Sequence, residues 1–311
     1  MSPEDPRTER ARLAAAGARA TTAAVVGGQP RKDVVRNTVF AVLLFAAILL
    51  ALAGLAALLI QAFVKGGPRL GFDLFTESGS SDPTIAGFKQ AILGSLMIIA
   101  GVIVLIVPLG VGAAVYLEEY ANKERWWNRL IELNIQNLAA VPSIIYGILG
   151  LGFIVGGPVD LGEIPAAASL TLALLVLPIV IIAAREAIRA VPPSIREGSL
   201  ALGATKWQTI RRQVLPASIA GIATGVILAV SRAFGEAAPL LLVGAAVFVT
   251  FDPQFFTEGY TALPVQIFQY ATRPQEEFRI LSAAGIVVLL VLLLAMNSFA
   301  IWLRNRYEQK W

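Results

Sequence analysis

Residues 216–248 read PASIAGIATGVILAVSRAFGEAAPLLLVGAAVF, a run in which only Arg232 and Glu236 carry charge. A helix needs about 20 mostly apolar residues to cross the hydrocarbon core of a bilayer, and this run is long enough. A charged side chain near the middle of a membrane costs at least ~2.5 kcal/mol, so such a residue usually faces protein or water and serves a function. The stretch therefore predicts a membrane-spanning helix that carries a functional charged pair.

The composition of the whole chain also indicates a membrane protein. Of its 311 residues, 57% are hydrophobic and 15% are charged, whereas a soluble domain carries about 25% charged residues. The chain has no Cys and no His, which excludes disulfides, thiolate chemistry, imidazole bases and most zinc or iron sites. This composition favours transport over catalysis, and we expect neither a catalytic residue nor a metal site.

Six segments are apolar and long enough to span a bilayer, which predicts an all-α integral membrane fold with six transmembrane helices. They cover residues 38–64, 91–116, 134–156, 165–184, 216–248 and 280–303. The third segment is the least regular, because it opens with polar residues and contains the Gly- and Pro-rich sequence VPSIIYGILGLG.

The distribution of Lys and Arg predicts the orientation of these helices. Basic residues are dense in the segment 1–36, in the loop after the fourth span and in the segment 304–311, and sparse in the two other long loops. Cytoplasmic segments carry the excess of Lys and Arg, so both termini are expected in the cytoplasm, as a disordered tail and a short tail. Residues 118–133 are expected to form a cytoplasmic loop whose Trp126 and Trp127 contact membrane lipid, and no nucleic-acid partner is expected.

The longest cytoplasmic connection is AREAIRAVPPSIREGSLALGATKWQTIRRQVLP, residues 184–216. Two adjacent prolines break the chain after the fourth span, and Ser194 with Glu197 forms a capping-box pattern for a first short helix. Gly203 permits a sharp turn before a second, basic helix, KWQTIRRQV. Two projecting helices suit the docking of another protein, and the alternative is that they lie along the membrane with Trp207 anchored there.

This loop resembles the EAA loop of ABC importer permeases, a motif of Glu-Ala-Ala, three residues, Gly, nine residues and Ile-x-Leu-Pro. The residues at the motif positions are Glu197, Gly198, Ser199, Gly203, Leu215 and Pro216. Gly198 and Ser199 replace the two alanines and Gln213 replaces the isoleucine, but small residues remain at the tight contacts. In the family this loop inserts into a cytoplasmic ATPase subunit, so the resemblance implies that these residues couple transport to ATP hydrolysis by a partner.

Two further stretches narrow the resemblance. LAAVPSIIYGILGLGF (138–153) and SRAFGEAAPLLLVG (231–244) resemble the A-type permease subunit of the phosphate-specific (Pst) importer. The resemblance implies a type I importer (MetI-like) transmembrane domain over residues 88–303, preceded by a first transmembrane helix and an extracytoplasmic loop at 37–87. It also implies passage of inorganic phosphate across the cytoplasmic membrane, with three kinds of partner: two copies of an ATPase that bind ATP and Mg, a homologous C-type permease, and an extracytoplasmic phosphate-binding protein.

The position of Arg232 on its helix bears on its role. Small residues recur every four positions along this helix, where another helix can pack closely. They are Gly221, Gly225, Ala229 and Ala233. Arg232 lies about 60° around the helix from Ala229, at about 100° per residue, so we expect it to point toward packed protein and not toward lipid.

The chemistry of the charged pair favours an oxyanion. Glu236 follows Arg232 by four residues, so the two side chains can meet on one face. The guanidinium matches two oxygens of an oxyanion, and Glu236 would hold it in place and prevent a permanent anion trap. Pro239 lacks an N–H and crowds the carbonyl of Gly235, so we expect a kink just beyond the pair. The alternative is a purely structural ion pair.

Other residues are weaker candidates for the route of the anion. Arg185, at the cytoplasmic end of the fourth span, could form a second anion site, or could be ordinary cytoplasmic charge. Pro142, Ser143 and Tyr146 either open the third span around the pathway or form a packed kink.

The chain has no phosphate-binding loop of the form G-x-x-x-x-G-K-[ST], because no lysine follows a glycine. Energy must then come from a partner, and no cofactor is expected on this chain. Three functions stay open: a phosphate importer permease, a permease of the same architecture for another oxyanion such as sulfate or molybdate, and an ion-gradient carrier or channel. The last leaves the loop at 197–216 unexplained.

Overall fold

The computed structural model describes residues 31–122, 124–245, 249–257 and 259–307. The chain divides into two compact units, residues 1–60 and 61–311. Helix α2 (Arg31–Gly66) forms the described part of the first unit and continues into the second. Because α2 begins at Arg31, the prediction of a disordered tail over 1–36 is wrong for its last residues, and residues 1–30 lie outside the described ones.

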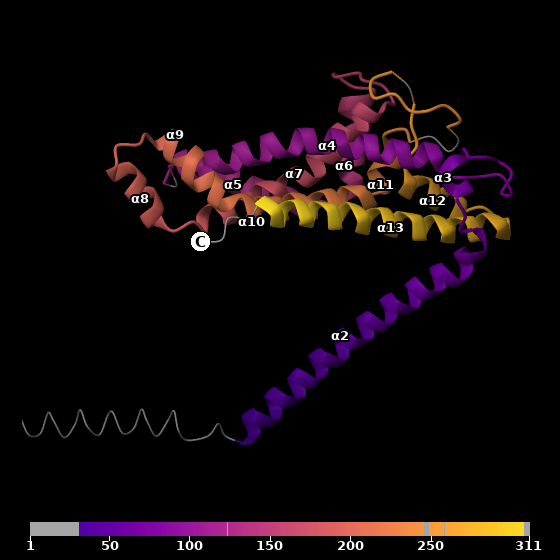
Figure 1. The fold of residues 1–311 in the computed structure, drawn as a ribbon, viewed down its shortest axis with the longest axis horizontal. Helices are drawn as coiled ribbons and strands as arrows, with labels where there is room; N and C mark the ends of the chain where they lie inside the picture. The colour runs from indigo at the N-terminus through magenta and orange to yellow at the C-terminus, as the bar shows by residue number, and fades with distance from the viewer. Residues whose placement is uncertain (1–30, 123, 246–248, 258, 308–311) are drawn as a thin grey trace, which may run out of the picture. The chain divides into compact units, whose positions relative to one another are not determined.

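Four long helices build the second unit and run side by side in Figure 1: α4 (Lys89–Val115), α7 (Pro165–Arg189), α10 (Leu215–Gly235) and α13 (Glu276–Tyr307). α7 packs against both α4 and α10. A Cβ added at Gly221 of α10 would lie 2.6 Å from the Cβ of Ala187, and one at Gly225 would collide with Ala183, so the backbones of α10 and α7 approach closely. The stripe of small residues on α10 therefore faces α7.

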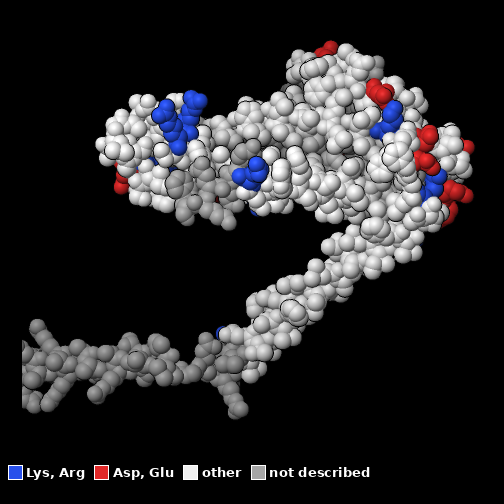
Figure 2. Space-filling model, in the orientation of Figure 1, with Lys and Arg blue, Asp and Glu red and all other residues white. Residues whose placement is uncertain are grey.

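The helices of the described residues fit a membrane protein. Five of them are long and apolar enough to cross a membrane, or six if one bent pair of helices counts as a span. Figure 2 shows that, on the face in view, most charged side chains lie toward the two ends of the second unit, and that the surface between them is uncharged apart from a small basic group. The prediction of an all-α fold with membrane-spanning helices is confirmed.

The third span is not a single helix over 134–156. The chain instead forms three elements, of which the first is bent by 106° from the other two: α5 (Trp126–Ala139), α6 (Ser143–Leu149) and the π-helical turn η3 (Gly150–Val155). The bend lies at Pro142, which has extended ψ (138°) and no N–H for a helical hydrogen bond. The prediction that 118–133 is a loop is also wrong at both ends, because a π-helical turn covers Tyr116–Tyr120 and α5 starts at Trp126.

The fifth span starts earlier than residue 216 and ends earlier than residue 248. A continuous helix covers Lys206–Gly235, made of α9 (Lys206–Thr209), the π-helical turn η4 (Ile210–Val214) and α10. Pro216 explains the π-helical turn, because it has no N–H to donate to the fourth residue before it. The N–H of Leu215 bonds instead to the carbonyl of Ile210, five residues back. The predicted basic helix KWQTIRRQV is thus the beginning of the fifth span.

The two ends of the second unit differ in their small elements. One end carries α3 (Asp73–Thr76), α12 (Leu263–Ala271) and the beginning of α13, and the other carries α8 (Pro193–Ala201) and α9 (Figure 1). At the first end, buried side chains hold the loops: Gln266 donates to the carbonyl of Gly87 at 3.2 Å, and Ser95 accepts the N–H of Leu263 at 2.8 Å. At the other end α13 stays helical to Tyr307, so the predicted tail 304–311 begins inside the helix.

Candidate functional site

Arg232 and Glu236 lie at the break of the fifth span. α10 ends at Gly235, Glu236 is extended (φ −79°, ψ 118°), and the chain resumes as the short helix α11 (Ala238–Leu242). Pro239 accounts for the break, because it cannot donate a hydrogen bond to the carbonyl of Gly235 and its ring crowds that carbonyl. The interruption that Pro239 predicts is present in the structure, and the charged pair lies directly at it.

The two charged side chains form a loose ion pair. Nε of Arg232 lies 3.4 Å from Oε1 of Glu236, whereas a strong charge-assisted hydrogen bond measures about 2.7–2.9 Å. The Arg232 side chain is 40% exposed and that of Glu236 is 19% exposed. Within the described residues, Arg232 makes this one hydrogen bond, so its guanidinium keeps donors for a group outside the chain.

The prediction that Arg232 points into packed protein is wrong for the second unit by itself, where its side chain is 40% exposed. Ala229 and Ala233 are buried, as the small-residue stripe requires, but Arg232 lies on the neighbouring face of α10. Leu228 and Gly235 are exposed on the same face, at four residues before and three residues after Arg232. Within the second unit, the described residues leave this face uncovered.

The two sequence stretches 138–153 and 231–244 meet in space. A Cβ added at Gly147 of α6 would lie 2.7 Å from the Cα of Pro239, so only glycine allows the two backbones to come this close. α6 and α11 pack against each other, and α6 also contacts α7. The third span thus supports the break of the fifth.

Tyr146 links the bend of the third span to the charged pair. Its side chain is buried, and its hydroxyl donates to the carbonyl of Leu138 at 2.9 Å, across the bend from α6 to α5. Its side chain packs in the same core cluster as Ala229 and Ala233 of α10, which flank Arg232 in the sequence. Pro142 precedes α6, and Ser143 is its first residue and is partly buried. These contacts favour a packed kink beside the pair.

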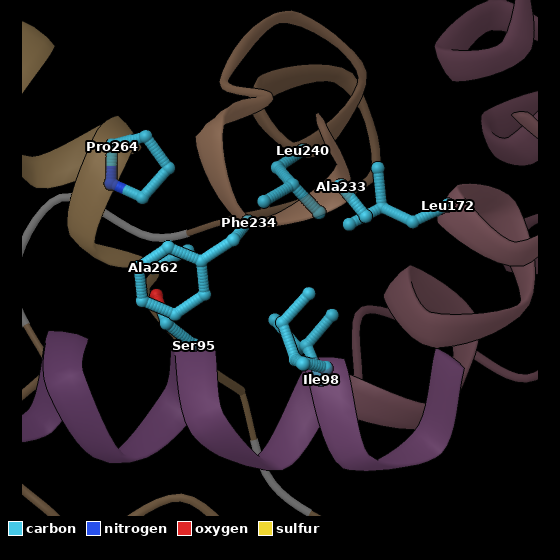
Figure 3. Close-up of a pocket in the computed structure, with 9 residues that line it drawn as sticks. Ser95, Ile98, Leu172, Ala233, Phe234, Leu240, Ala262 and Pro264 are labelled. Carbon is cyan, nitrogen blue, oxygen red and sulfur yellow. The ribbon is translucent and has the colours of Figure 1, made fainter. Parts of the chain in front are cut away.

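A small cavity lies beside the break, against Ala233, Phe234 and Leu240 (Figure 3). Its volume is about 10 Å³, and its walls are apolar apart from the hydroxyl of Ser95, which already accepts a backbone N–H. A cavity of this size holds about one water molecule at most, so a tetrahedral oxyanion does not fit. An anion that meets Arg232 must therefore approach from the exposed side of α10.

The loop at 184–216 contains the two predicted helical segments with a bend between them. Gly203 has φ +83°, a conformation that glycine adopts readily and other residues rarely. Glu197 and Gly198 are exposed on α8, and Leu202 at the tip of the loop is 91% exposed. The hydroxyls of Ser199 and Thr209 lie 2.9 Å apart and hold the two segments together.

The helix caps of this loop differ from the prediction. α8 is preceded by Pro192 and has no side-chain cap, so Ser194 and Glu197 do not form the predicted capping box. A capping box is present at the next segment, where Thr205 and Gln208 bond to each other's backbone N–H. Leu215 and Pro216 begin α10, directly after η4.

Arg185 lies in a network of ion pairs that the sequence did not reveal. Its side chain is 8% exposed and lies 3.0 Å from Glu118 and 2.8 Å from Glu132. Two carboxylates neutralise it, so the geometry favours a structural role over a second anion site. Glu118 also bonds to Arg189 at 2.6 Å. The acidic residues after the second span could have indicated buried ion pairs, but their basic partners lie far away in the sequence.

Comparison with known proteins gives matches over most of the chain. A sequence model of the family described as "Binding-protein-dependent transport system inner membrane component" matches residues 106–309. The chain is 34% identical, over 270 residues, to the phosphate transport system permease protein PstA of Yersinia pestis, which covers 85% of this chain and 88% of that protein.

Two solved structures have a similar fold. A chain of the inward-facing MetNI methionine ABC transporter is 19% identical, with a TM-score of 0.55, over 74% of this chain and 100% of that one. A chain of a bacterial alginate ABC transporter, in complex with an alginate pentasaccharide-bound periplasmic protein, is 16% identical, with a TM-score of 0.63, over 90% and 98%. The predicted type I importer (MetI-like) fold is therefore confirmed.

Proposed function

This chain belongs to the family of binding-protein-dependent transport system inner membrane components, and we propose that it carries inorganic phosphate across the cytoplasmic membrane as the A-type permease subunit of an ATP-driven importer. The observation that carries the proposal is its 34% identity with a phosphate transport permease over 85% of the chain. The charged pair on the uncovered face of α10 supports the same function.

We assign Arg232 to the route of the anion. Its guanidinium is exposed, lies at a helix break, and offers two parallel N–H groups that match two oxygens of a phosphate ion. Glu236 lies 3.4 Å away and competes for the same N–H groups. A carboxylate at this distance can be displaced by the anion and can take the guanidinium back afterwards, which allows both binding and release.

The uncovered face of α10 is the place for a second permease subunit. Leu228, Arg232 and Gly235 share this face, and the cavity that lies beside the break on the inner side has a volume of only about 10 Å³. A homologous C-type permease with the same fold would cover Leu228 and enclose the route between the two subunits. Arg232 would then be shielded from lipid by the partner instead of by its own chain.

The two ends of the second unit support a proposal for the energy source and the orientation. We place two copies of an ATPase, which bind ATP and Mg, at the end that carries α8, with Glu197, Gly203 and Leu202 at the contact. The opposite end would face the outside and receive a phosphate-binding protein. Both termini would then lie in the cytoplasm, and this chain would hydrolyse no ATP itself.

The test is anion uptake by the complete importer in proteoliposomes that contain ATP. The proposal expects uptake of radiolabelled phosphate that requires both the binding protein and the ATPase. Sulfate or molybdate uptake at a higher rate than phosphate would assign another oxyanion. Phosphate uptake that persists without the ATPase would show a carrier or channel and overturn the proposal.

A further inference from the structure

The end of α4 is a π-helical turn, η2 (Tyr116–Tyr120, YLEEY), which contacts both arms of the loop at 184–216. The N–H of Ala121 bonds to the carbonyl of Tyr116 at 2.8 Å, five residues back. A π-helical turn contains one residue more than an α-helical turn and is frequent at functional sites. Three consecutive residues of η2 each contact a different element.

Glu118 of η2 binds the end of α7. Its side chain is 5% exposed and lies 3.0 Å from Arg185 and 2.6 Å from Arg189. A carboxylate buried to this degree is stable only with such partners. The first contact of η2 therefore anchors it to the most buried helix of the second unit.

Glu119 binds α8. Its carboxylate, 9% exposed, lies 2.9 Å from the guanidinium of Arg196. Arg196 also donates to the carbonyls of Ile188 and Val191 at 2.8 and 2.6 Å, where α7 ends. One guanidinium thus joins α8 to both α4 and α7.

Tyr120 contacts the other arm of the loop. Nζ of Lys206, the first residue of α9, lies 5.0 Å from the centre of the Tyr120 ring, within range of a cation–π interaction. Because α9 continues through η4 into α10, this contact joins η2 to the helix that carries Arg232.

α8 depends on these polar contacts, because apolar packing holds it weakly. None of its residues is fully buried, and Ile195 reaches a core cluster only in part. The contacts described for its other side chains are polar: Arg196 bonds to Glu119 and to the carbonyls of Ile188 and Val191, and Ser199 bonds to Thr209. The ion pair with Glu119 therefore gives α8 a direct polar connection to η2, beside its contacts with α9, η4 and the end of α7.

We propose that η2 is the joint that transmits movement of α8 to α4 and α10, and that Glu119 and Arg196 are the positioning residues of this joint. The inference rests on the proposed function, in which α8 receives the ATPase. In this view the ion pair makes α8 and η2 move as one body. Removing it would leave an assembled importer that hydrolyses ATP without moving anion.

The experiment compares Glu119→Gln and Arg196→Gln importers with the wild type in proteoliposomes. The measured quantities are the stimulation of ATP hydrolysis by phosphate-loaded binding protein and the number of anions moved per ATP. We expect both to fall about tenfold, within the range of coupling between distant sites. Basal hydrolysis and co-purification of the ATPase should persist. Glu186→Gln, which removes an exposed ion pair with Arg189 of α7 (3.1 Å) and leaves Glu119 and Arg196 unchanged, is the control and should change neither quantity.

A second measurement keeps the test decisive if a single variant assembles poorly. The chain has no Cys, so Glu119→Cys with Arg196→Cys can be joined by a short bifunctional thiol reagent, with cysteine-free partner subunits. The unlinked double variant should be uncoupled, and linking should restore stimulation to within about twofold of the wild type. Normal coupling in Glu119→Gln would overturn the proposal that η2 is the joint. So would a failure of the cross-link to restore stimulation of ATP hydrolysis. A wild-type importer without any ATP-dependent uptake would instead overturn the proposed function.

Discussion

Replacement of Arg232 by Gln separates a transport role from a structural one, because the two roles predict different magnitudes. The pair with Glu236 is 3.4 Å long, and the Arg232 side chain is 40% exposed. Exposed ion pairs contribute about 0–1 kcal/mol to stability. Arg232→Gln should therefore lower the free energy of unfolding by at most about 1 kcal/mol and leave assembly with the partner subunits intact.

The effect on transport should be much larger. A hydrogen bond to a charged group contributes about 1.5–3 kcal/mol, and the guanidinium can make two to one oxyanion. Gln has one neutral NH2 group and no charge, so the interaction with the oxyanion weakens by about 3 kcal/mol or more. At 1.36 kcal/mol per factor of ten, uptake should fall by about 100-fold. Arg232→Lys, which keeps the charge and loses the planar fork, should retain part of the rate.

The assay is the initial rate of phosphate uptake per assembled importer, with assembly measured by the co-purified ATPase. Glu236→Gln should bind phosphate and release it slowly, because Arg232 then lacks its competing carboxylate. Glu186→Gln is the control, since it breaks another exposed ion pair, 3.1 Å long, away from the helix break. Its uptake should equal that of the wild type.

The double variant Arg232→Gln with Glu236→Gln decides between the two roles. If the pair is only structural, each single change lowers the amount of protein and the double change restores it together with transport. A double variant that carries phosphate at the wild-type rate per importer would remove both residues from the mechanism. Low uptake by a fully assembled double variant is the outcome that a transport role requires.

Three further predictions concern the loop, the orientation and the packing. Gly203→Val should uncouple hydrolysis from transport, because a non-glycine residue at φ +83° costs roughly 1–2 kcal/mol; normal uptake per ATP would contradict this. A Cys introduced at Ser80 should react with an impermeant thiol reagent only from outside, and one at Thr205 only from the cytoplasm; the reverse pattern would invert the topology. Gly225→Ala should destabilise the importer by about 1–3 kcal/mol, as judged from its thermal denaturation, because the added methyl group collides with Ala183. Ala183→Gly in the same chain should restore much of this loss, and no restoration would refute the proposed contact.

Local sequence signals predicted the features that local chemistry determines. Hydropathy gave the positions of the long helices, and Pro239 gave the break after Gly235, because a proline acts on the residues directly before it. The spacing of small residues on α10 predicted that another helix packs against it, because such a stripe is a local pattern; the structure shows that this helix is α7. Pro142 also signalled a break, but not its angle of 106°, which depends on how α5 and α6 pack on other helices.

Features that depend on distant parts of the chain could not be predicted. Glu118 and Arg185 are 67 residues apart in the sequence. The mixed charges around Glu118 are typical of a solvated loop, and the ion pair exists only because α4 and α7 lie side by side in the fold. The exposure of Arg232 was missed because the small-residue stripe shows where one helix packs, but not whether another helix of the second unit covers the adjacent face. A second subunit is the natural cover for that face, and no periodicity within one chain reports it.

The continuous helix from Lys206 to Gly235 ties the coupling loop to the charged pair. Its 30 residues, at 1.5 Å per residue, extend about 45 Å and reach Arg232 without interruption of the helix. At Gly235 the helix stops, so a tilt that starts at α9 moves Arg232 relative to α11 and to the α6 that packs on it. Such a movement changes the separation of Arg232 and Glu236, and with it the affinity for the anion.

Changes at the two ends of this helix, in the coupling loop and at Arg232, should therefore affect different kinetic parameters of uptake. Gly203→Val should lower the maximal uptake rate and leave the half-saturating phosphate concentration unchanged, whereas Arg232→Gln should change both. If Gly203→Val altered only the half-saturating concentration, movement of the loop could not be the step that drives release at Arg232.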